Sequence, residues 1–465
     1  MKKILFFIAA LLVCTGAWAQ DITGNWVGTL AIQGISLKLV FHIEKTSDGY
    51  SATMDSPDQG GFGLPTSRVA FDGNRLELSA GQLGLSYSGT LANDSINGIF
   101  RQGGLQLPLV LKRSEQDASP TMNRPQNPHP PFPYDVKDVT FRNNDAGVTL
   151  AGTLTLPKGQ GPFPAVVLIA GSGPNDRDET IFGHKPFLVL ADHLTRHGFA
   201  VLRYDKRGIG ASTGDYAHAL TFDFAQDAAA AVRFLRERKD IDRGKVALIG
   251  HSEGGVIAPM VAAQDDAFKA IVLMAGTGVK GIEVILYQNE VSMTQQNLKT
   301  EDIEKLQRSN REIFESLSRR PDALPDTTVL HSQLIRLWEG LPPQSKQGTD
   351  KDKFIRSNLK GFLSPWYRHF LALNPSDYLL KVKCPVLALN GENDRQVSAA
   401  QNLQGIATAL QKGGNKHVTV RSYPRLNHLF QESQTGYVDE YARIEQTLSP
   451  QVLEDITNWI RTQNN

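Results

Sequence analysis

The chain has 465 residues, of which 40% are hydrophobic and 21% are charged. These values are those of an ordinary globular protein, so they exclude a disordered chain and a protein with many membrane-spanning helices. Lys and Arg total 49 against 48 Asp and Glu, and no block of five or six like charges occurs. The balance provides no electrostatic footprint for nucleic acid or anionic lipid, and it favours a small or neutral partner.

The first 19 residues (1–19) have the pattern of a secretory signal peptide. Lys2 and Lys3 precede an uncharged run over residues 4–13, and residues 17–19 read Ala-Trp-Ala, as at a signal peptidase site. The run is well short of the ~20 apolar residues that span a bilayer. We therefore expect cleavage after residue 19 or 20, an exported protein that is periplasmic or secreted, and no membrane span in the mature chain.

Residues 21–115 have the pattern of an all-β domain. Apolar and polar residues alternate over 35–44, and leucine recurs at every second position over 105–111. Six to eight short strands separated by turn signals predict a small antiparallel barrel or sandwich. The opening Gly-Asn-Trp at 24–26 resembles the start of a lipocalin-type barrel. A lipid- or glycan-binding role and a packing role are both open for this domain.

Six prolines fall within residues 116–133 and predict a semi-rigid linker between two domains. Strand and helix patterns alternate after residue 134, and several of the candidate strands are nearly continuous Val, Ile, Leu and Ala runs, as in strands buried on both faces. Eight candidate strands lie at 138–142, 149–156, 165–170, 199–204, 245–249, 270–275, 386–390 and 418–423, with candidate helices at 185–197, 222–238, 255–264 and 450–461. We predict an α/β fold for residues 134–465, with a mostly parallel eight-stranded sheet covered on both faces.

A Gly-x-Ser-x-Gly motif follows the fifth of these strands. Residues 250–255 read Gly-His-Ser-Glu-Gly-Gly and lead into a helix of small residues. In this strand-turn-helix context, Gly250 and Gly254 let neighbouring backbone pass close, and the serine hydroxyl projects clear of the sheet. Ser252 is therefore the candidate nucleophile.

A serine hydroxyl needs a base to accept its proton and a carboxylate to fix the tautomer of that base. Asp394 follows the strand at 386–390 and His428 follows the strand at 418–423, and sites in parallel sheets lie at the carboxyl ends of strands. We predict that Asp394 is the acid and His428 the base. Glu392 is the rival acid, but its position two residues earlier in a tight turn favours an outward direction.

A tetrahedral intermediate also needs two backbone N–H donors for its oxygen. The motif supplies the N–H of Glu253, and either Ser172 or Gly173, in the loop after the strand at 165–170, is the second candidate. The mature chain keeps a single cysteine, Cys384, which excludes an internal disulfide and a cysteine-based metal cluster. Neither a metal nor a cofactor is predicted.

In combination these motifs resemble the α/β-hydrolase superfamily, in particular its bacterial exported esterase branch, which is similar to serine aminopeptidases and to the catalytic domains of prolyl oligopeptidases. The resemblance covers residues 134–465 and rests also on the loops at 171–178 and 204–212. It implies an acyl-enzyme on Ser252, with His428 as base and Asp394 as the orienting carboxylate.

Two further expectations come from this resemblance. In the loop at 204–212, Asp205 and Arg207 are expected to brace the site structurally. Asn427 departs from the family pattern, in which glycine is common before the histidine, so the shape of that loop is open.

The family also places a helical cap over the active site, and residues 277–376 interrupt the strand-helix alternation where such a cap is expected. Helical spacing is visible at 301–317 and 329–337. Aromatic residues in the cap are candidates for the substrate pocket, with interior packing of the cap as the alternative. They are Phe362, Trp366, Tyr367 and Phe370.

The leading hypothesis is an exported carboxylesterase that needs no metal and acts on small-molecule esters. The alternatives are a peptidase or aminopeptidase-like hydrolase and a thioesterase. The non-enzymatic alternative is a lipid- or glycan-binding protein that acts through its N-terminal β-domain. The sequence carries no signal for the oligomeric state.

Overall fold

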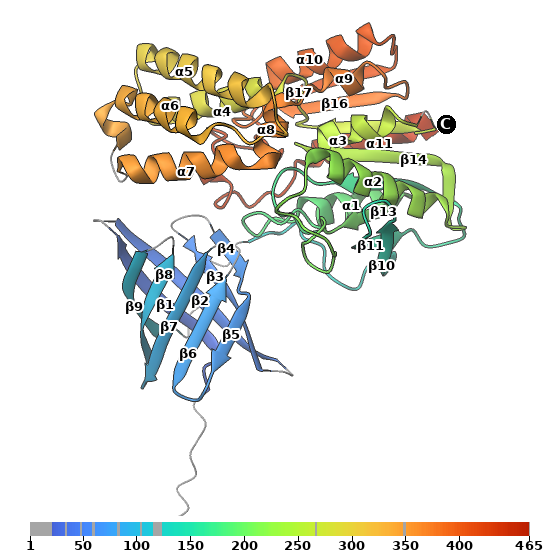
Figure 1. The fold of residues 1–465 in the computed structure, drawn as a ribbon. Coiled ribbons are helices and arrows are strands. Elements are labelled where there is room, and N and C mark those ends of the chain that lie inside the picture. The colour runs from blue at the N-terminus through green and yellow to red at the C-terminus, as the bar shows by residue number, and fades with distance from the viewer. Residues whose placement is uncertain are drawn as a thin grey trace, which may run out of the picture. The chain divides into compact units, whose positions relative to one another are not determined.

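The computed structural model describes residues 21–464, apart from 33–34, 47–48, 58–60, 81–83, 103–104, 115–122, 266 and 347–349. The predicted signal segment and the first part of the predicted linker lie outside the described residues. The described residues form two compact units, one up to residue 114 and one from residue 123 onward (Figure 1). Within these ranges, no helix combines the length and the apolar character needed to cross a bilayer.

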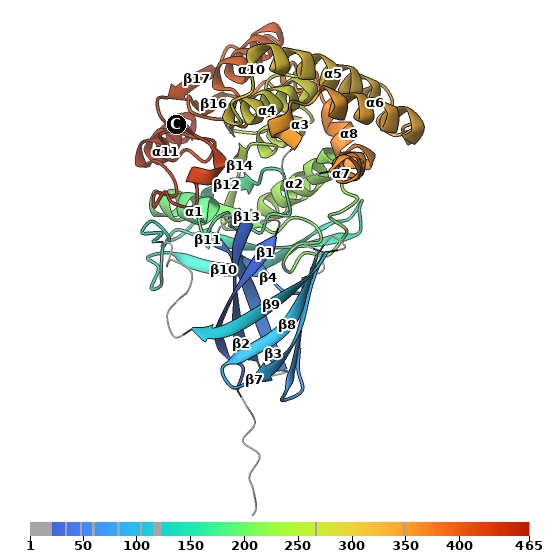
Figure 2. The same ribbon diagram turned by 90° about the vertical axis from the view of Figure 1, so that its left-hand side faces the viewer.

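The first unit is an antiparallel sheet of nine described strands (Figure 2). They are β1 (Gly24–Ile32), β2 (Ile35–Thr46), β3 (Gly49–Ser56), β4 (Gly61–Pro65), β5 (Arg68–Phe71), β6 (Arg75–Ala80), β7 (Leu85–Ala92), β8 (Ser95–Gln102) and β9 (Leu105–Ser114), in the sheet order β4-β3-β2-β1-β9-β8-β7-β6-β5. The chain passes directly from one edge strand, β4, to the other, β5. Thr66 N–H donates to the Ala52 carbonyl of β3 at 3.1 Å, and Ser67 N–H donates to the Ser79 carbonyl of β6 at 2.7 Å. The chain thus joins the two edges of the sheet, and β3 also lies against β5, so the sheet curls into a near-barrel. This confirms the predicted fold class, with nine described strands in place of six to eight.

Large apolar side chains fill the interior of this barrel. Trp26, Phe41 and Tyr87 are each at most 1% exposed. The indole N–H of Trp26 donates to the Ile22 carbonyl at 2.8 Å, and the Arg113 guanidinium lies over the indole ring, 4.5 Å from its centroid. The inward face of the alternating pattern is thus the apolar one, and a cation–π contact covers the buried tryptophan.

The second unit contains all eight strands that the sequence predicts. They are β10 (Asp135–Asn143), β11 (Val148–Leu156), β12 (Phe163–Ile169), β13 (Ala200–Tyr204), β14 (Ile241–His251), β15 (Ala270–Met274), β16 (Val386–Gly391) and β17 (Val418–Tyr423). Their order is β10-β11-β13-β12-β14-β15-β16-β17, and every neighbouring pair from β13 to β17 is parallel. The predicted α/β architecture is confirmed, and it brings the carboxyl ends of β12, β14, β16 and β17 to one edge.

Helices cover both faces of this sheet. One face packs against α1 (Pro186–Arg196) and α11 (Pro450–Asn464), and the other packs against α2 (Thr221–Arg236), α3 (Gly254–Ala262), α9 (Ser376–Leu379) and α10 (Ala399–Lys412). The helices α9 and α10 were not among those predicted. The two apolar layers explain why the central strands read as continuous apolar runs.

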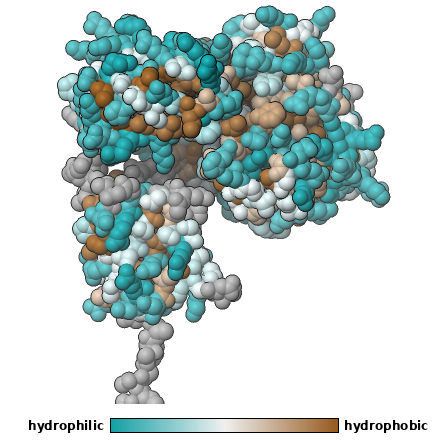
Figure 3. Space-filling model, in the orientation of Figure 1, coloured by the Kyte–Doolittle hydropathy of each residue, from teal (hydrophilic) through white to brown (hydrophobic). Residues whose placement is uncertain are grey.

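A helical segment is inserted between β15 and β16, where the cap was expected. It consists of α4 (Gly281–Gln295), α5 (Thr300–Ser318), α6 (Thr327–Gly340), the 3₁₀ turn at Pro343–Lys346, α7 (Lys351–Leu363) and α8 (Pro365–Ala372). These helices share a core of their own, which includes Phe314 and Leu334. On the face drawn in Figure 3, apolar residues form a band across these helices with polar residues on both sides.

Candidate active site

Ser252 lies on a sharp turn between β14 and α3. Its φ is +54°, a left-handed conformation that is rare for a residue with a side chain. A Cβ at Gly250 would lie 1.9 Å from the Gly254 carbonyl oxygen, and a Cβ at Gly254 would lie 2.0 Å from the Ile169 carbonyl oxygen. Glycine is therefore required on both sides, and the Ser252 N–H anchors the turn by donating to the Met274 carbonyl at 2.8 Å.

The structure brings Ser252, His428 and Asp394 together. His428 Nε2 lies 3.1 Å from Ser252 Oγ, and His428 Nδ1 lies 2.7 Å from Asp394 Oδ2. The other Asp394 oxygen accepts the backbone N–H groups of Gln396 and Val397 at 2.7 and 2.8 Å. Because the Asp394 carboxylate accepts a hydrogen bond from Nδ1, the Nε2 lone pair faces the serine hydroxyl, so His428 can accept its proton.

The loop of His428 is shaped by its neighbour Asn427. The buried Asn427 side-chain oxygen accepts the N–H groups of Leu429 and Gln431 at 3.0 and 2.9 Å. A side chain thus stabilises the turn at the position where the family commonly has glycine. The rival carboxylate Glu392 instead accepts the Ser422 hydroxyl at 2.7 Å on an exposed part of the surface.

The loop after β12 lies directly against the nucleophile. A Cβ at Gly171 would lie 3.0 Å from the Cβ of Ser252. The Gly171 carbonyl accepts the Asn175 side-chain amide at 2.7 Å and the Lys206 ammonium at 2.5 Å. These bonds hold the backbone of this loop, which carries both candidate oxyanion residues, beside Ser252.

The two candidate donors in this loop differ in their partners. The N–H of Gly173 faces the hydroxyl of Tyr216, whose pKa is raised to about 12 by burial and by the nearby Glu253 carboxylate. In the part of the chain that the structure describes, the N–H groups of Ser172 and Glu253 donate no hydrogen bond. Ser172 and Glu253 are therefore the pair left available for a substrate oxygen.

The side chain of Glu253 is held by three hydrogen-bond donors, one of which is a cation. This buried carboxylate accepts the Thr221 hydroxyl at 2.6 Å and the Trp366 indole N–H at 2.8 Å through one oxygen, and its other oxygen lies 3.3 Å from the Lys206 ammonium. The Lys206 ammonium also lies 4.2 Å from the centroid of the Phe224 ring. This network joins α2, the cap helix α8 and the nucleophile turn.

Asp205 and Arg207 each form an ion pair with two hydrogen bonds. Arg177 donates to the two oxygens of Asp205 through Nε at 3.1 Å and Nη2 at 2.8 Å, and Arg207 donates to the two oxygens of Asp227 through Nε at 2.7 Å and Nη2 at 2.8 Å. Such paired, largely buried charges stabilise the loop at 204–212 in one conformation.

The cap aromatics predicted as pocket residues are in two different environments. The rings of Phe362 and Tyr367 pack against each other and against Phe314, and both residues line a cap pocket of about 210 Å³. Trp366 instead stacks on Phe370 and extends to Glu253 beside the nucleophile. Trp366 is thus the one of these aromatics that bonds to the nucleophile turn.

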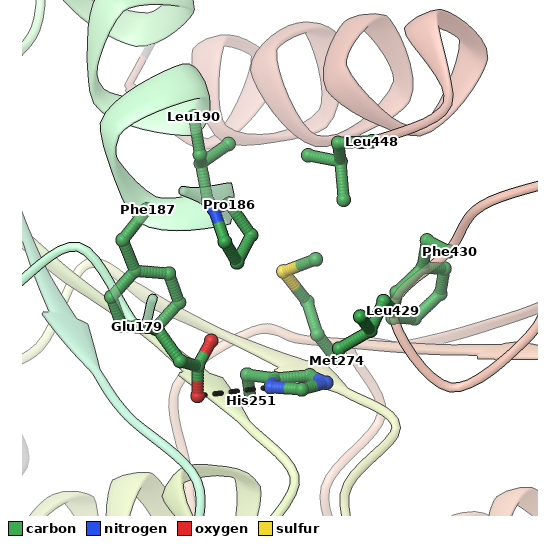
Figure 4. A pocket seen from close by; sticks show the side chains of 9 residues that line it. All are labelled: Glu179, Pro186, Phe187, Leu190, His251, Met274, Leu429, Phe430 and Leu448. Atoms are coloured by element: carbon green, nitrogen blue, oxygen red, sulfur yellow. Dashed lines mark hydrogen bonds and ion pairs between the residues drawn. The ribbon is translucent and has the colours of Figure 1, made fainter. Parts of the chain in front are cut away.

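One pair beside the site was not predicted from the sequence. His251 Nδ1 lies 3.0 Å from Glu179 Oε1 (Figure 4). His251 Nε2 lies 3.0 Å from the backbone oxygen of His428. Sequence position was the one signal that could have indicated this pair. Glu179 directly follows the loop at 171–178, and His251 lies within the serine motif.

The profile of the X-Pro dipeptidyl-peptidase (S15) family matches residues 146–421, more than half of the chain. The chain belongs to this family. It has the α/β-hydrolase fold, as the motifs predict.

Curated relatives match shorter stretches. Esterase EstD of Thermotoga maritima is 42% identical over 137 residues, 30% of this chain and 31% of that protein. Esterase FrsA of Serratia proteamaculans is 33% identical over 132 residues, 28% of this chain and 29% of that protein. The chain spans between about a third and a half of the length of the curated relatives it matches.

Solved structures align with about 70% of the chain at low identity. An esterase of Pyrococcus furiosus has a TM-score of 0.42 at 14% identity and covers 71% of this chain and 91% of its own. The α/β hydrolase GrgF of Penicillium sp. sh18 has a TM-score of 0.45 at 17% identity and covers 71% of this chain and 99% of its own.

Proposed function

We propose that this protein hydrolyses carboxylic esters through an acyl-enzyme on Ser252. The observation that carries the proposal is the hydrogen-bonded chain from the Ser252 hydroxyl through His428 to Asp394. This order of nucleophile, base and orienting carboxylate is the arrangement that activates a serine hydroxyl.

In the first half-reaction His428 takes the Ser252 proton while Oγ attacks the ester carbonyl carbon. The N–H groups of Ser172 and Glu253 donate to the resulting oxyanion, and its collapse expels the alcohol, which takes the proton back from His428. Water then attacks the acyl-serine with His428 again as base. The acid leaves and the serine hydroxyl is restored.

A peptide substrate is the second candidate, because the family is named for a peptidase. A dipeptidyl-peptidase acts next to a free substrate ammonium, and binding that charge calls for a carboxylate that is not already paired with a cation. The buried carboxylate beside the nucleophile, Glu253, is already shared among Thr221, Trp366 and Lys206. Its negative charge is already balanced by the Lys206 ammonium, and this pairing, together with the relatives named esterases, supports an uncharged ester as the substrate.

A matched panel separates the two candidates. We expect p-nitrophenyl esters of short acids to be cleaved faster than an X-Pro p-nitroanilide. Ser252→Ala should lower kcat/KM for the esters at least about 10⁴-fold, while Ser332→Ala, at an exposed serine on α6, should leave it unchanged. Ester turnover that survives in Ser252→Ala would refute the mechanism, and a preference for the anilide would refute the substrate class.

We also propose that the chain is exported, on the basis of the charged, apolar and small-residue pattern of residues 1–19. N-terminal sequencing of the protein from a periplasmic fraction should begin at residue 20 or 21. Recovery of the uncleaved chain in the cytoplasmic fraction alone would contradict this proposal.

A further inference from the structure

A carboxylate and an imidazole connect the two loops that flank Ser252. Glu179 Oε1 accepts the N–H of Gly171 at 2.6 Å and faces His251 Nδ1, while His251 Nε2 faces the backbone oxygen of His428. We propose that Glu179 and His251 are positioning residues, a charged pair that holds the oxyanion loop and the loop of His428 in register on either side of Ser252. This proposal rests on the proposed hydrolytic function.

The hydrogen bonds of His251 determine its charge. Both ring nitrogens face oxygen atoms, a carboxylate at 3.0 Å and a backbone carbonyl at 3.0 Å, and neither of these groups can donate. A neutral imidazole has one N–H and would direct a lone pair at one of the two oxygens, whereas an imidazolium donates to both. The geometry therefore selects the doubly protonated ring.

The electrostatic surroundings agree with this charge. Burial is the largest single influence and opposes the charged form, but the Glu179 carboxylate, the His428 carbonyl and the charge of Asp394 together raise the pKa of His251 above its ordinary value. The His428 ring is the other titratable group that faces His251, with 4.9 Å between the ring centroids. The side chains of His251 and Glu179 are each only 7% exposed.

The pair lies in an apolar enclosure, where hydrogen bonds between charged groups are strong. Figure 4 shows the side chains of Phe187, Leu190 and Met274 on the same side of the pair, together with the residues that follow His428. The second oxygen of Glu179 is buried and has no hydrogen-bond partner among the described residues, and the adjoining cavity of about 10 Å³ has room for roughly one water molecule.

Backbone strain is concentrated at the same place. Glu179 has φ +53° and Ser252 has φ +54°, and neither is a glycine. Such conformations persist where the surrounding contacts over-determine them, and they cluster at functional sites. Here the contacts of the Glu179 carboxylate hold its residue and the loop at 171–178 in place.

The consequence for catalysis is geometric. The bond from His251 fixes the backbone of the base, and the bond from Gly171 to Glu179 fixes the loop that carries Ser172. A displacement of about 1 Å at a reacting group can cost about 10²-fold in rate. Removing the pair should therefore lower kcat and leave KM largely unchanged.

Isosteric variants test the pair. We expect Glu179→Gln and His251→Leu each to lower kcat about 10- to 100-fold and to keep KM within about threefold of the unmodified protein. The kcat of the double variant should be no lower than that of the worse single variant, because the two residues act as one unit. His251→Gln, which can still donate to the His428 carbonyl, should be more active than His251→Leu. His331→Gln, on the exposed face of α6, is the matched control.

The pH profile distinguishes positioning from a general loss of structure. Because Glu179 raises the pKa of His251, Glu179→Gln should lower the pKa of His251. The charged ring is the form that holds the loops, so the alkaline fall of kcat should begin at lower pH in this variant than in the unmodified protein. Any of three results would overturn the proposal. The folded single variants could keep kcat within twofold of the unmodified protein, the losses of kcat could add in the double variant, or the alkaline fall of kcat could stay at the same pH in Glu179→Gln.

A measurement on the unmodified protein keeps the proposal falsifiable if the variants do not fold. ¹⁵N spectra of the histidine rings should show both nitrogens of His251 protonated at pH 7, and a neutral His251 would overturn it. The two failures are also distinguishable. Turnover that survives in Ser252→Ala refutes the proposed function, whereas an inactive Ser252→Ala beside a fully active Glu179→Gln refutes only the pair.

Discussion

Two buried histidines show how immediate neighbours decide the charge of a side chain. His251 lies between two acceptors and is an imidazolium. His184 is fully buried, with Nδ1 2.9 Å from the Thr447 hydroxyl and Nε2 3.0 Å from the Tyr441 carbonyl and 2.9 Å from the Gln431 side-chain amide nitrogen. The hydroxyl and the amide can each donate to a ring nitrogen, so these partners suit a neutral ring. Burial and the positive charge of Arg124 lower the pKa of His184 to about 4.

This neutral histidine predicts acid sensitivity. Between pH 6.5 and about 4 the unfolded chain protonates His184 while the folded chain does not, so the free energy of unfolding falls as pH falls through this window, by up to about 3 kcal/mol from this group. Urea unfolding at pH 7 and pH 4.5 measures the loss. In His184→Gln the difference between the two pH values should be smaller by a comparable amount, and an equal difference would contradict the assignment.

At the scale of elements, the nucleophile turn depends on close backbone approach. Gly254→Ala places a methyl group 2.0 Å from the Ile169 carbonyl of the rigid strand β12, so α3 cannot dock. We expect loss of soluble protein or a loss of at least about 3 kcal/mol of unfolding free energy. Gly361→Ala on α7 is the matched control, because its added methyl group meets no atom within 4 Å and should be neutral or slightly stabilising. Equal behaviour of the two variants in thermal unfolding would refute this reading of the turn.

The sequence predicted those parts of the fold that depend on local pattern. Strands buried on both faces read as apolar runs, and Asp394 and His428 could be proposed because each directly follows such a strand. The helix α10 was missed. Its Gly405 weakens the helical pattern, and the structure shows why glycine is needed, since a Cβ there would lie 2.3 Å from the Gly278 carbonyl.

Contacts between distant segments could not be predicted in this way. Glu179 and His251 lie 72 residues apart, and the parallel pairing of β12 with β14 brings together the loops that carry them. The cap aromatics illustrate the same limit, because an aromatic run predicts burial without specifying what buries it. Phe362 and Tyr367 pack within the cap, whereas Trp366 extends to Glu253.

At the scale of the whole molecule, the two units have separate cores. The barrel core and the two cores of the α/β sheet share no residue, and every side chain of the candidate site lies between residues 123 and 464. We therefore expect a chain that begins at residue 122 to hydrolyse p-nitrophenyl acetate with kcat/KM within about threefold of the full chain. A loss above tenfold in a folded, monodisperse truncated protein would show that the barrel contributes to catalysis.

The central claim is that Ser252 is acylated during turnover. Rapid acid quenching with p-nitrophenyl acetate, followed by peptide mass spectrometry, measures this directly. An acetyl group on the peptide that contains Ser252, absent in Ser252→Ala and formed with a burst of p-nitrophenol, is the predicted result. Acetyl transfer to another residue at the turnover rate would contradict the mechanism. Turnover of the ester by Ser252→Ala would contradict it as well.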